Sequence, residues 1–150
     1  MHKLMRIALF VFAGTLFAQS PFVGTWKLNS AETKYTTGEP PKDATLMIVE
    51  QGDSLQVTAT GTNSDGSPLS VKYTVPIKGG AGQMQEGPYD AISANVPSAN
   101  VRENTYRKGG QIVATRRWEV SADGKTLRSR VKGMNTTGQN VAGTDVFDKQ

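Results

Sequence analysis

Side chains that carry most enzyme chemistry are scarce in this sequence. It has a single histidine, His2, and no cysteine. Without further imidazole or thiolate groups, the chain lacks the means for a Ser-His-Asp triad, a cysteine nucleophile, or an ordinary zinc, haem or copper site. Its acidic residues stand singly, without the alternating Asp/Asn spacing of a calcium loop. We therefore expect a protein that is not an enzyme and that has no metal and no cofactor.

One cation, Arg116, stands where it could take part in binding. It shares the alternation of the apolar residues in its segment, so on a regular strand its guanidinium points inward with the side chains of Ile112, Ala114, Trp118 and Val120. A buried charge without a partner is costly. Three arrangements would remove that cost: pairing with an internal carboxylate, binding of an anion, or a β-bulge at Arg116-Arg117 that turns both side chains outward.

Residues 1–18 have the parts of a secretory signal peptide. Lys3 and Arg6 form a basic start, and an apolar run follows that ends at the small residue Ala18. That run has 12 residues, fewer than the roughly 20 that a membrane-spanning helix needs. We predict cleavage after Ala18 and a secreted or periplasmic protein, with an uncleaved interfacial helix as the alternative. Once Lys3 and Arg6 are subtracted from the 17 basic residues, 15 remain against 13 acidic residues, a net charge of +2.

The rest of the chain alternates short patterned segments with turn sequences. Asp-Gly and Gly-Gly pairs supply the positive φ of tight hairpins. In one segment Leu55, Val57 and Ala59 share a face, which is the period of a half-buried strand. A single helical turn over 30–34, capped by Ser30, is the one helical element expected. We predict about ten strands, at 22–29, 44–51, 54–61, 69–76, 82–86, 90–96, 100–108, 111–121, 126–133 and 140–149.

These segments fit one closed sheet. Short links between neighbouring strands favour an antiparallel meander. Such a meander, apolar on one face, closes most simply on itself, because closure removes exposed strand edges. We therefore predict that residues 19–150 form a single all-β domain, an antiparallel up-and-down β-barrel of about 8–10 strands. A β-sandwich is the competing architecture.

Both ends of the mature chain resemble one superfamily. The segment PFVGTWKL, residues 21–28, contains Gly-x-Trp on a first strand, and the chain finishes with TDVFDK, residues 144–149. In these features it is similar to the calycins, which include the lipocalins and the fatty-acid-binding proteins. The resemblance implies a small lipocalin-like barrel that holds a ligand, with Trp26 as a structural plug at its closed end.

The chain also departs from the fatty-acid-binding branch. Residues 30–43 are too few for the helical pair that covers the cavity in that family. Asp145 and Phe147 stand where the family has the Arg and Tyr of its carboxylate clamp. The alignment directs Asp145 inward, so an internal Arg116–Asp145 ion pair becomes one solution for the buried cation.

The expected ligand site follows from these patterns. Its residues are Tyr73, Tyr106, Arg116, Trp118, Asp145 and Phe147. The predicted function is that of an exported, non-enzymatic barrel that binds a small, mostly apolar ligand. The alternative is a structural or interaction barrel with a filled core and no ligand.

Basic residues gather towards the C-terminus. Residues 102–132 hold nine of the 15 Lys and Arg residues that follow the predicted signal peptide. Arg128, Arg130 and Lys132 alternate with smaller or apolar residues, so we expect one outward stripe. Such a stripe is a solvated face, or a surface attracted to anionic envelope polymer or lipid. Without interleaved surface aromatics we expect no nucleic-acid partner, and we expect a monomer that does not span a membrane.

Overall fold

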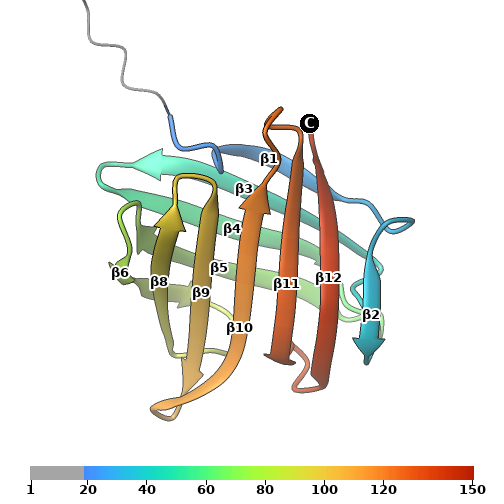
Figure 1. Cartoon of the computed structure of the whole chain (residues 1–150). Coiled ribbons are helices and arrows are strands. Elements are labelled where there is room, and N and C mark those ends of the chain that lie inside the picture. Colours follow the sequence, from blue (N-terminus) through green and yellow to red (C-terminus); the bar gives the residue numbers. More distant parts are fainter. Residues whose placement is uncertain (1–18) are drawn as a thin grey trace, which may run out of the picture.

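The structure, a computed structural model, describes residues 19–150. The predicted signal peptide, 1–18, lies outside the described residues. Within 19–150 the chain forms twelve β-strands and no helix (Figure 1). The strands are β1 Gly24–Leu28, β2 Lys34–Thr37, β3 Asp43–Gln51, β4 Ser54–Thr62, β5 Pro68–Pro76, β6 Gly80–Ala81, β7 Gln83–Glu86, β8 Ala91–Ser98, β9 Val101–Lys108, β10 Gln111–Val120, β11 Thr126–Met134 and β12 Asn140–Lys149.

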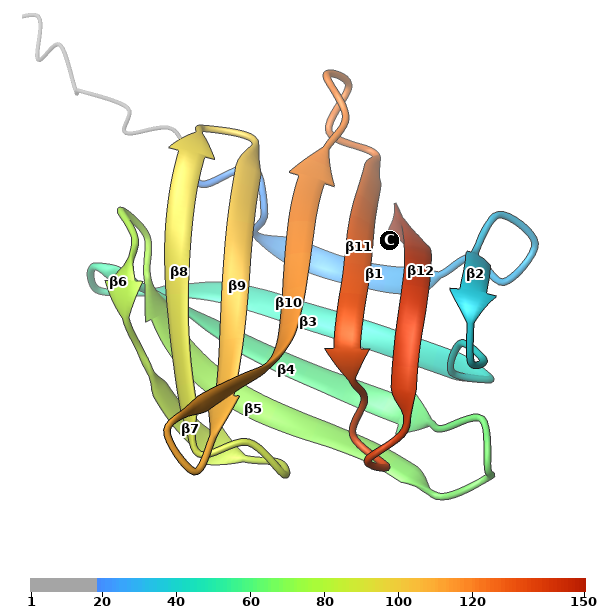
Figure 2. The same ribbon diagram turned by 60° about the horizontal axis from the view of Figure 1, so that its bottom comes forward.

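The strands make one antiparallel sheet that curls into a nearly closed barrel. They pair in the order β6-β8-β9-β10-β11-β12-β1-β3-β4-β5-β7. The two ends of this order, β6 and β7, follow each other in the chain and are separated by Gly82, whose N–H donates to the Ile92 carbonyl oxygen at 2.9 Å. This short segment therefore links β8 to β5 and brings the sheet round on itself. In Figures 1 and 2, strands β8 to β12 run across β1, β3, β4 and β5. The predicted all-β antiparallel barrel is confirmed, with more strands than the sequence patterns indicated.

Strand β2 is the main element that the sequence patterns do not predict. The chain turns after β1, and the cap of this turn is Asn29 rather than Ser30: the Asn29 side-chain oxygen accepts the Glu32 N–H at 3.1 Å. The Thr33 N–H donates to the Asn29 carbonyl oxygen at 3.1 Å, which closes the turn. Residues 34–37 then pair with β12 next to the part of β12 that pairs with β1. The segment between the first two long strands is therefore a strand where the fatty-acid-binding family has helices.

A bulge in β10 corrects one residue of the predicted inward face. The register of β10 against β9 shifts between Ile112 and Ala114, so the strand has an extra residue at Val113. Ile112 consequently lies 60% exposed on the outside, and the prediction that it points inward is wrong. From Ala114 onward the register is regular, so no bulge occurs at Arg116 and that alternative is excluded.

Apolar side chains fill one half of the barrel. Trp26 is 0% exposed, and its indole N–H donates to the Phe22 carbonyl oxygen at 2.9 Å. Packed in the same core are Ile48, Leu55, Val75, Val120 and Leu127. Arg102 also lies in this half of the barrel. Its guanidinium donates to the Pro76 and Ile77 carbonyl oxygens at 2.7 and 2.9 Å. The stripe of Arg128, Arg130 and Lys132 is exposed, as expected from its alternation.

Candidate functional site

The other half of the barrel contains a cavity. Its volume is about 80 Å³, and its rim is formed by the loops that follow β2, β4 and β11. Glu39 and Pro41 come from the first loop, and Asn63 and Ser64 come from the second. The third loop contributes Asn135 and Thr136. The rest of the lining is mostly apolar and includes Ala44, Leu46, Val57, Ala59, Leu69, Val71 and Phe147.

All six residues that the sequence assigns to a ligand site line this one cavity. They are Tyr73, Tyr106, Arg116, Trp118, Asp145 and Phe147. They come from four different strands, β5, β9, β10 and β12, and strand alternation places each on the inner face. Their convergence follows from closure of the barrel. Their role in binding stays a prediction.

The inward Arg116 is neutralised by an internal carboxylate. Its Nη1 lies 2.9 Å from Asp145 Oδ2, and the two side chains are 25% and 2% exposed. Burial is the largest single influence and acts to lower the pKa of Arg116, but the Asp145 carboxylate together with Tyr35 and Tyr106 outweighs it and holds that pKa above its ordinary value. The interior ion pair that the sequence offered as one of three arrangements is therefore the one formed.

Ser129 joins this pair to the aromatic wall. It lies directly opposite Asp145 in the β11–β12 ladder. Its hydroxyl oxygen accepts one hydrogen bond from Arg116 Nη1 at 3.2 Å and one from the Trp118 indole N–H at 3.1 Å. Sequence reasoning missed Ser129 because this segment was interpreted only through its basic residues, Arg128 and Arg130, which flank the serine. The available signal was strand alternation: because Arg128 and Arg130 point outward, the side chain of Ser129 between them points inward.

The four tyrosines of the sequence all line the cavity. Tyr73 and Tyr106 meet edge to face, with ring centroids 5.8 Å apart and hydroxyl oxygens 2.9 Å apart. The ring of Tyr89 lies 4.9 Å from that of Tyr106, and its hydroxyl donates to the Met134 carbonyl oxygen at 2.7 Å. Burial raises the pKa of Tyr89 to about 12 and also raises the pKa values of Tyr73 and Tyr106. These hydroxyls are therefore neutral at ordinary pH.

Tyr35 completes the wall next to the ion pair. It projects from β2, and a side chain on the opposite residue Gly143 would overlap its ring, so this contact requires glycine. Burial raises the pKa of Tyr35. Because the phenol lies close to both charges of the ion pair, Arg116 opposes this rise and Asp145 adds to it. Sequence reasoning missed Tyr35 because it expected a turn followed by irregular chain, with no strand to direct the side chain.

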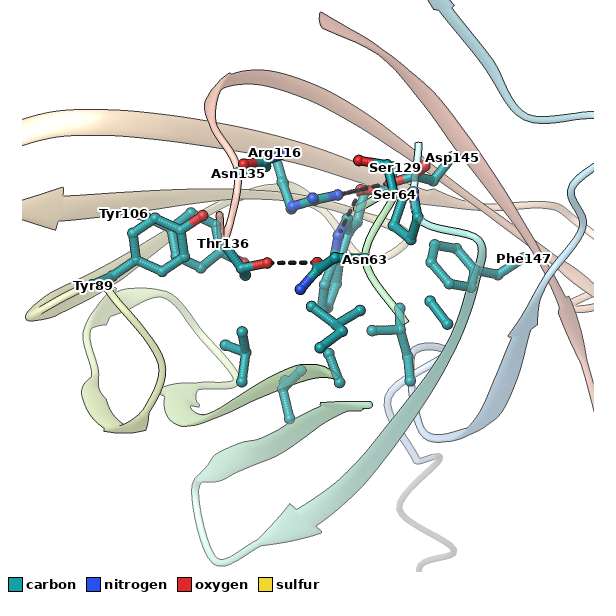
Figure 3. Close-up of a pocket in the computed structure, with 18 of the residues that line it drawn as sticks. Asn63, Ser64, Tyr89, Tyr106, Arg116, Ser129, Asn135, Thr136, Asp145 and Phe147 are labelled. Atoms are coloured by element: carbon teal, nitrogen blue, oxygen red, sulfur yellow. Dashed lines mark hydrogen bonds and ion pairs between the residues drawn. The ribbon is translucent and has the colours of Figure 1, made fainter. Parts of the chain in front are cut away.

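A hydrogen bond joins two loops across the rim. The Thr136 hydroxyl donates to Asn63 Oδ1 at 2.8 Å, which ties the β11–β12 turn to the β4–β5 turn (Figure 3). Asn63 is 6% exposed, and its side-chain N–H donates to the Pro68 carbonyl oxygen at 3.1 Å. Asn63 therefore stabilises the β4–β5 turn and also fixes the neighbouring β11–β12 turn. Closing these loops together limits the space through which a molecule reaches the cavity.

Within residues 19–150, no three His, Cys, Asp or Glu side chains gather in a way that could hold a metal ion. That part of the chain also contains no helix that could cross a bilayer. No protein-family model matches the sequence, and no curated protein is significantly similar to it.

Proposed function

We propose that this protein binds a small, neutral, mostly apolar molecule in the barrel cavity. The observation that carries the proposal is an apolar cavity in which the cation among the described lining residues, Arg116, is already matched by Asp145 at 2.9 Å. Concave apolar sites with a few placed polar groups are the usual form of small-molecule sites. A charged ligand would upset the balance of this pair in surroundings that screen charge poorly.

The size of the cavity limits the ligand to a few heavy atoms inside the barrel. Its volume of about 80 Å³ is roughly half of the 150 Å³ of an engineered protein cavity that holds benzene. A long acyl chain would require the rim loops to separate and the wall residues to move. A five-membered ring or a short branched chain fits the enclosed part, and any remainder of the molecule would lie between the rim loops.

The proposal extends to family and location. We propose a distant calycin-like relationship, which is supported by Gly24-Thr25-Trp26 on the first strand of an antiparallel barrel and by the burial of Trp26. Export is supported by the composition of residues 1–18. Binding rather than catalysis is supported by the engagement of Asp145 in the ion pair, because Glu39, the other carboxylate lining the cavity, lies exposed on the rim.

A structural barrel without a ligand is the second candidate. It is favoured by the small cavity volume and by the hydrogen bond that joins the rim loops at 2.8 Å. Native mass spectrometry of protein purified from its own host separates the two candidates. A bound small molecule supports the binding function, and its absence after mild purification supports the structural one.

A matched pair of variants locates any such molecule. Ala59→Leu adds bulk to a residue that lines the cavity, whereas Thr58→Leu adds similar bulk to the neighbouring position, which points out of the barrel. We expect the adduct mass to disappear with Ala59→Leu and to remain with Thr58→Leu. Retention of the adduct in both variants would place the molecule elsewhere on the protein.

A further inference from the structure

The unsatisfied polar groups of the cavity specify the chemistry of its ligand. We propose, building on the binding function above, that the ligand is a small carbonyl compound whose oxygen accepts hydrogen bonds from Arg116 and from the Tyr73–Tyr106 hydroxyl pair. A buried polar group without a partner is destabilising, so the free donors and acceptors around the cavity decide which molecule it accepts.

Arg116 has more N–H groups than the protein uses. A guanidinium carries five N–H donors, and among residues 19–150 both hydrogen bonds of Arg116, to Ser129 and to Asp145, involve Nη1. Nη2 and Nε therefore remain for a ligand. The side chain lines the cavity and retains 25% exposure, so these donors are reachable from inside the barrel.

The two central tyrosines provide a second free donor. Their hydroxyls lie 2.9 Å apart and carry two protons, but one hydrogen bond between them uses only one proton. Tyr73 is 1% exposed and Tyr106 is 4% exposed, so bulk water does not surround the second proton. Among residues 19–150 each hydroxyl has the other as its hydrogen-bond partner. The spare O–H group requires an acceptor that enters the cavity.

Acceptors in the inner cavity are already engaged or out of reach. Ser129 Oγ accepts from both Arg116 and Trp118. Asp145 Oδ2 accepts from Arg116, while Oδ1 is wholly enclosed and has no hydrogen-bond partner among the described residues. The Tyr35 phenol beside this pair offers one acceptor to Arg116 and one donor to Asp145. The other N–H groups of Arg116 and the spare tyrosine O–H still exceed the acceptors left to them, so a ligand that satisfies them must accept hydrogen bonds.

A neutral carbonyl oxygen meets these requirements better than a carboxylate. It has two lone pairs, which match one donor from Arg116 and one from the tyrosine pair. A carboxylate would bring a negative charge close to Asp145, whose own charge already neutralises Arg116. The hydrocarbon part of the molecule would rest on Leu46, Val57 and Val71, which form the apolar wall.

The experiment compares cyclopentanone with methylenecyclopentane, which replaces the carbonyl oxygen by a CH₂ group of similar shape. Dissociation constants come from NMR titration, with the indole N–H of Trp118 as the cavity signal and that of Trp26, which does not line the cavity, as the internal reference. The variant is Tyr73→Phe with Tyr106→Phe, which removes both hydroxyls and keeps both rings. The control is Thr74→Val with Thr105→Val, which removes a hydroxyl next to each tyrosine on the outer face of the same two strands.

We expect the double variant to bind cyclopentanone about tenfold more weakly, which is the loss of one neutral hydrogen bond. Each single variant leaves one hydroxyl proton free, so we expect a change of less than about threefold. Binding of methylenecyclopentane should not weaken in the double variant, and the Thr74→Val, Thr105→Val control should affect the binding of neither molecule.

Three outcomes would overturn the inference in distinguishable ways. Equal cyclopentanone affinity in the wild type and the double variant would show that the hydroxyls do not recognise a carbonyl, while the binding function would stand. Tighter binding of cyclopentanecarboxylate than of cyclopentanone would show that the site takes anions. Failure of all three molecules to shift the Trp118 signal would overturn the proposed function together with the inference.

Discussion

The Arg116–Asp145 pair permits a quantitative test of how the barrel interior is built. Replacing Asp145 with Ala leaves a guanidinium inside the barrel with Ser129 as its remaining partner at 3.2 Å. Breaking one side of a buried ion pair typically costs about 3–5 kcal/mol in the free energy of unfolding. Arg116 is 25% exposed towards the cavity. We therefore expect Asp145→Ala to lower the free energy of unfolding by an amount near the lower end of that range, about 3 kcal/mol.

The reverse replacement should be more destabilising. Arg116→Met strands a carboxylate whose side chain is only 2% exposed, and we expect a loss near the upper end, about 5 kcal/mol. The double variant, Arg116→Met with Asp145→Ala, removes both charges and leaves an apolar pair. We expect its loss to be smaller than the sum of the two single losses by at least about 2 kcal/mol, the signature of direct coupling.

Chemical denaturation followed by tryptophan fluorescence measures these losses, because Trp26 and Trp118 are both buried in the folded barrel. The exposed pair of Arg117 with Glu103, whose side chains are 44% and 43% exposed, is a matched control on the outer face of β9 and β10. For this surface pair we expect a coupling below about 1 kcal/mol. If the losses at Arg116 and Asp145 add within about 0.5 kcal/mol, the reasoning about the internal pair is refuted.

Three further predictions concern the closed end, the tyrosines and the N-terminus. Trp26→Ala should lower the free energy of unfolding by about 3–5 kcal/mol, since a fully buried aromatic is lost from the core; a loss below about 1 kcal/mol in a denaturant melt would show that Trp26 is no plug. Folded-state tyrosine pKa values raised by burial, to about 12 for Tyr89, mean that the unfolded chain loses phenolic protons near pH 10 while the folded barrel keeps them. Stability should therefore be full below about pH 10 and fall as the pH rises towards 12, and tyrosinate absorbance should appear together with unfolding; gradual ionisation near pH 10 with the barrel intact would contradict this. N-terminal sequencing of extracellular or periplasmic protein should begin at Gln19, whereas intact Met1 on cytoplasmic protein would contradict export.

Much of the fold could be predicted because strand structure has a local signature. Alternation of apolar and polar residues assigns each side chain to a face, and Asp-Gly and Gly-Gly pairs mark the turns. The strand pattern over 54–61 corresponds to β4, Ser54–Thr62, and that over 126–133 corresponds to β11, Thr126–Met134. The same alternation placed Arg116 and Trp118 inside, and the family resemblance directed Asp145 inward, so closing the barrel was enough to bring them together.

Errors arose where pairing between distant strands overrides the local pattern. Ile112 has the correct parity for the interior, but the bulge against β9 turns it outward, and a bulge is a property of two strands rather than of one. Arg102 lies inside the barrel, where the carbonyl oxygens of Pro76 and Ile77 accept its hydrogen bonds, and no local pattern predicts this placement. Neither partner is near it in the sequence.

The inner face of the barrel was therefore encoded in short segments of sequence, whereas the shape and polarity of the cavity were decided by the assembled sheet. β2 exists because β12 offers it a free edge beyond β1, and only this pairing directs Tyr35 towards the ion pair. Ser129 becomes a bridge because the β11–β12 register sets it opposite Asp145. Asn63 and Thr136, 73 residues apart, meet across the rim because two hairpins end at the same opening. Alternation specifies which way a side chain points, but the strand register specifies which side chain it meets.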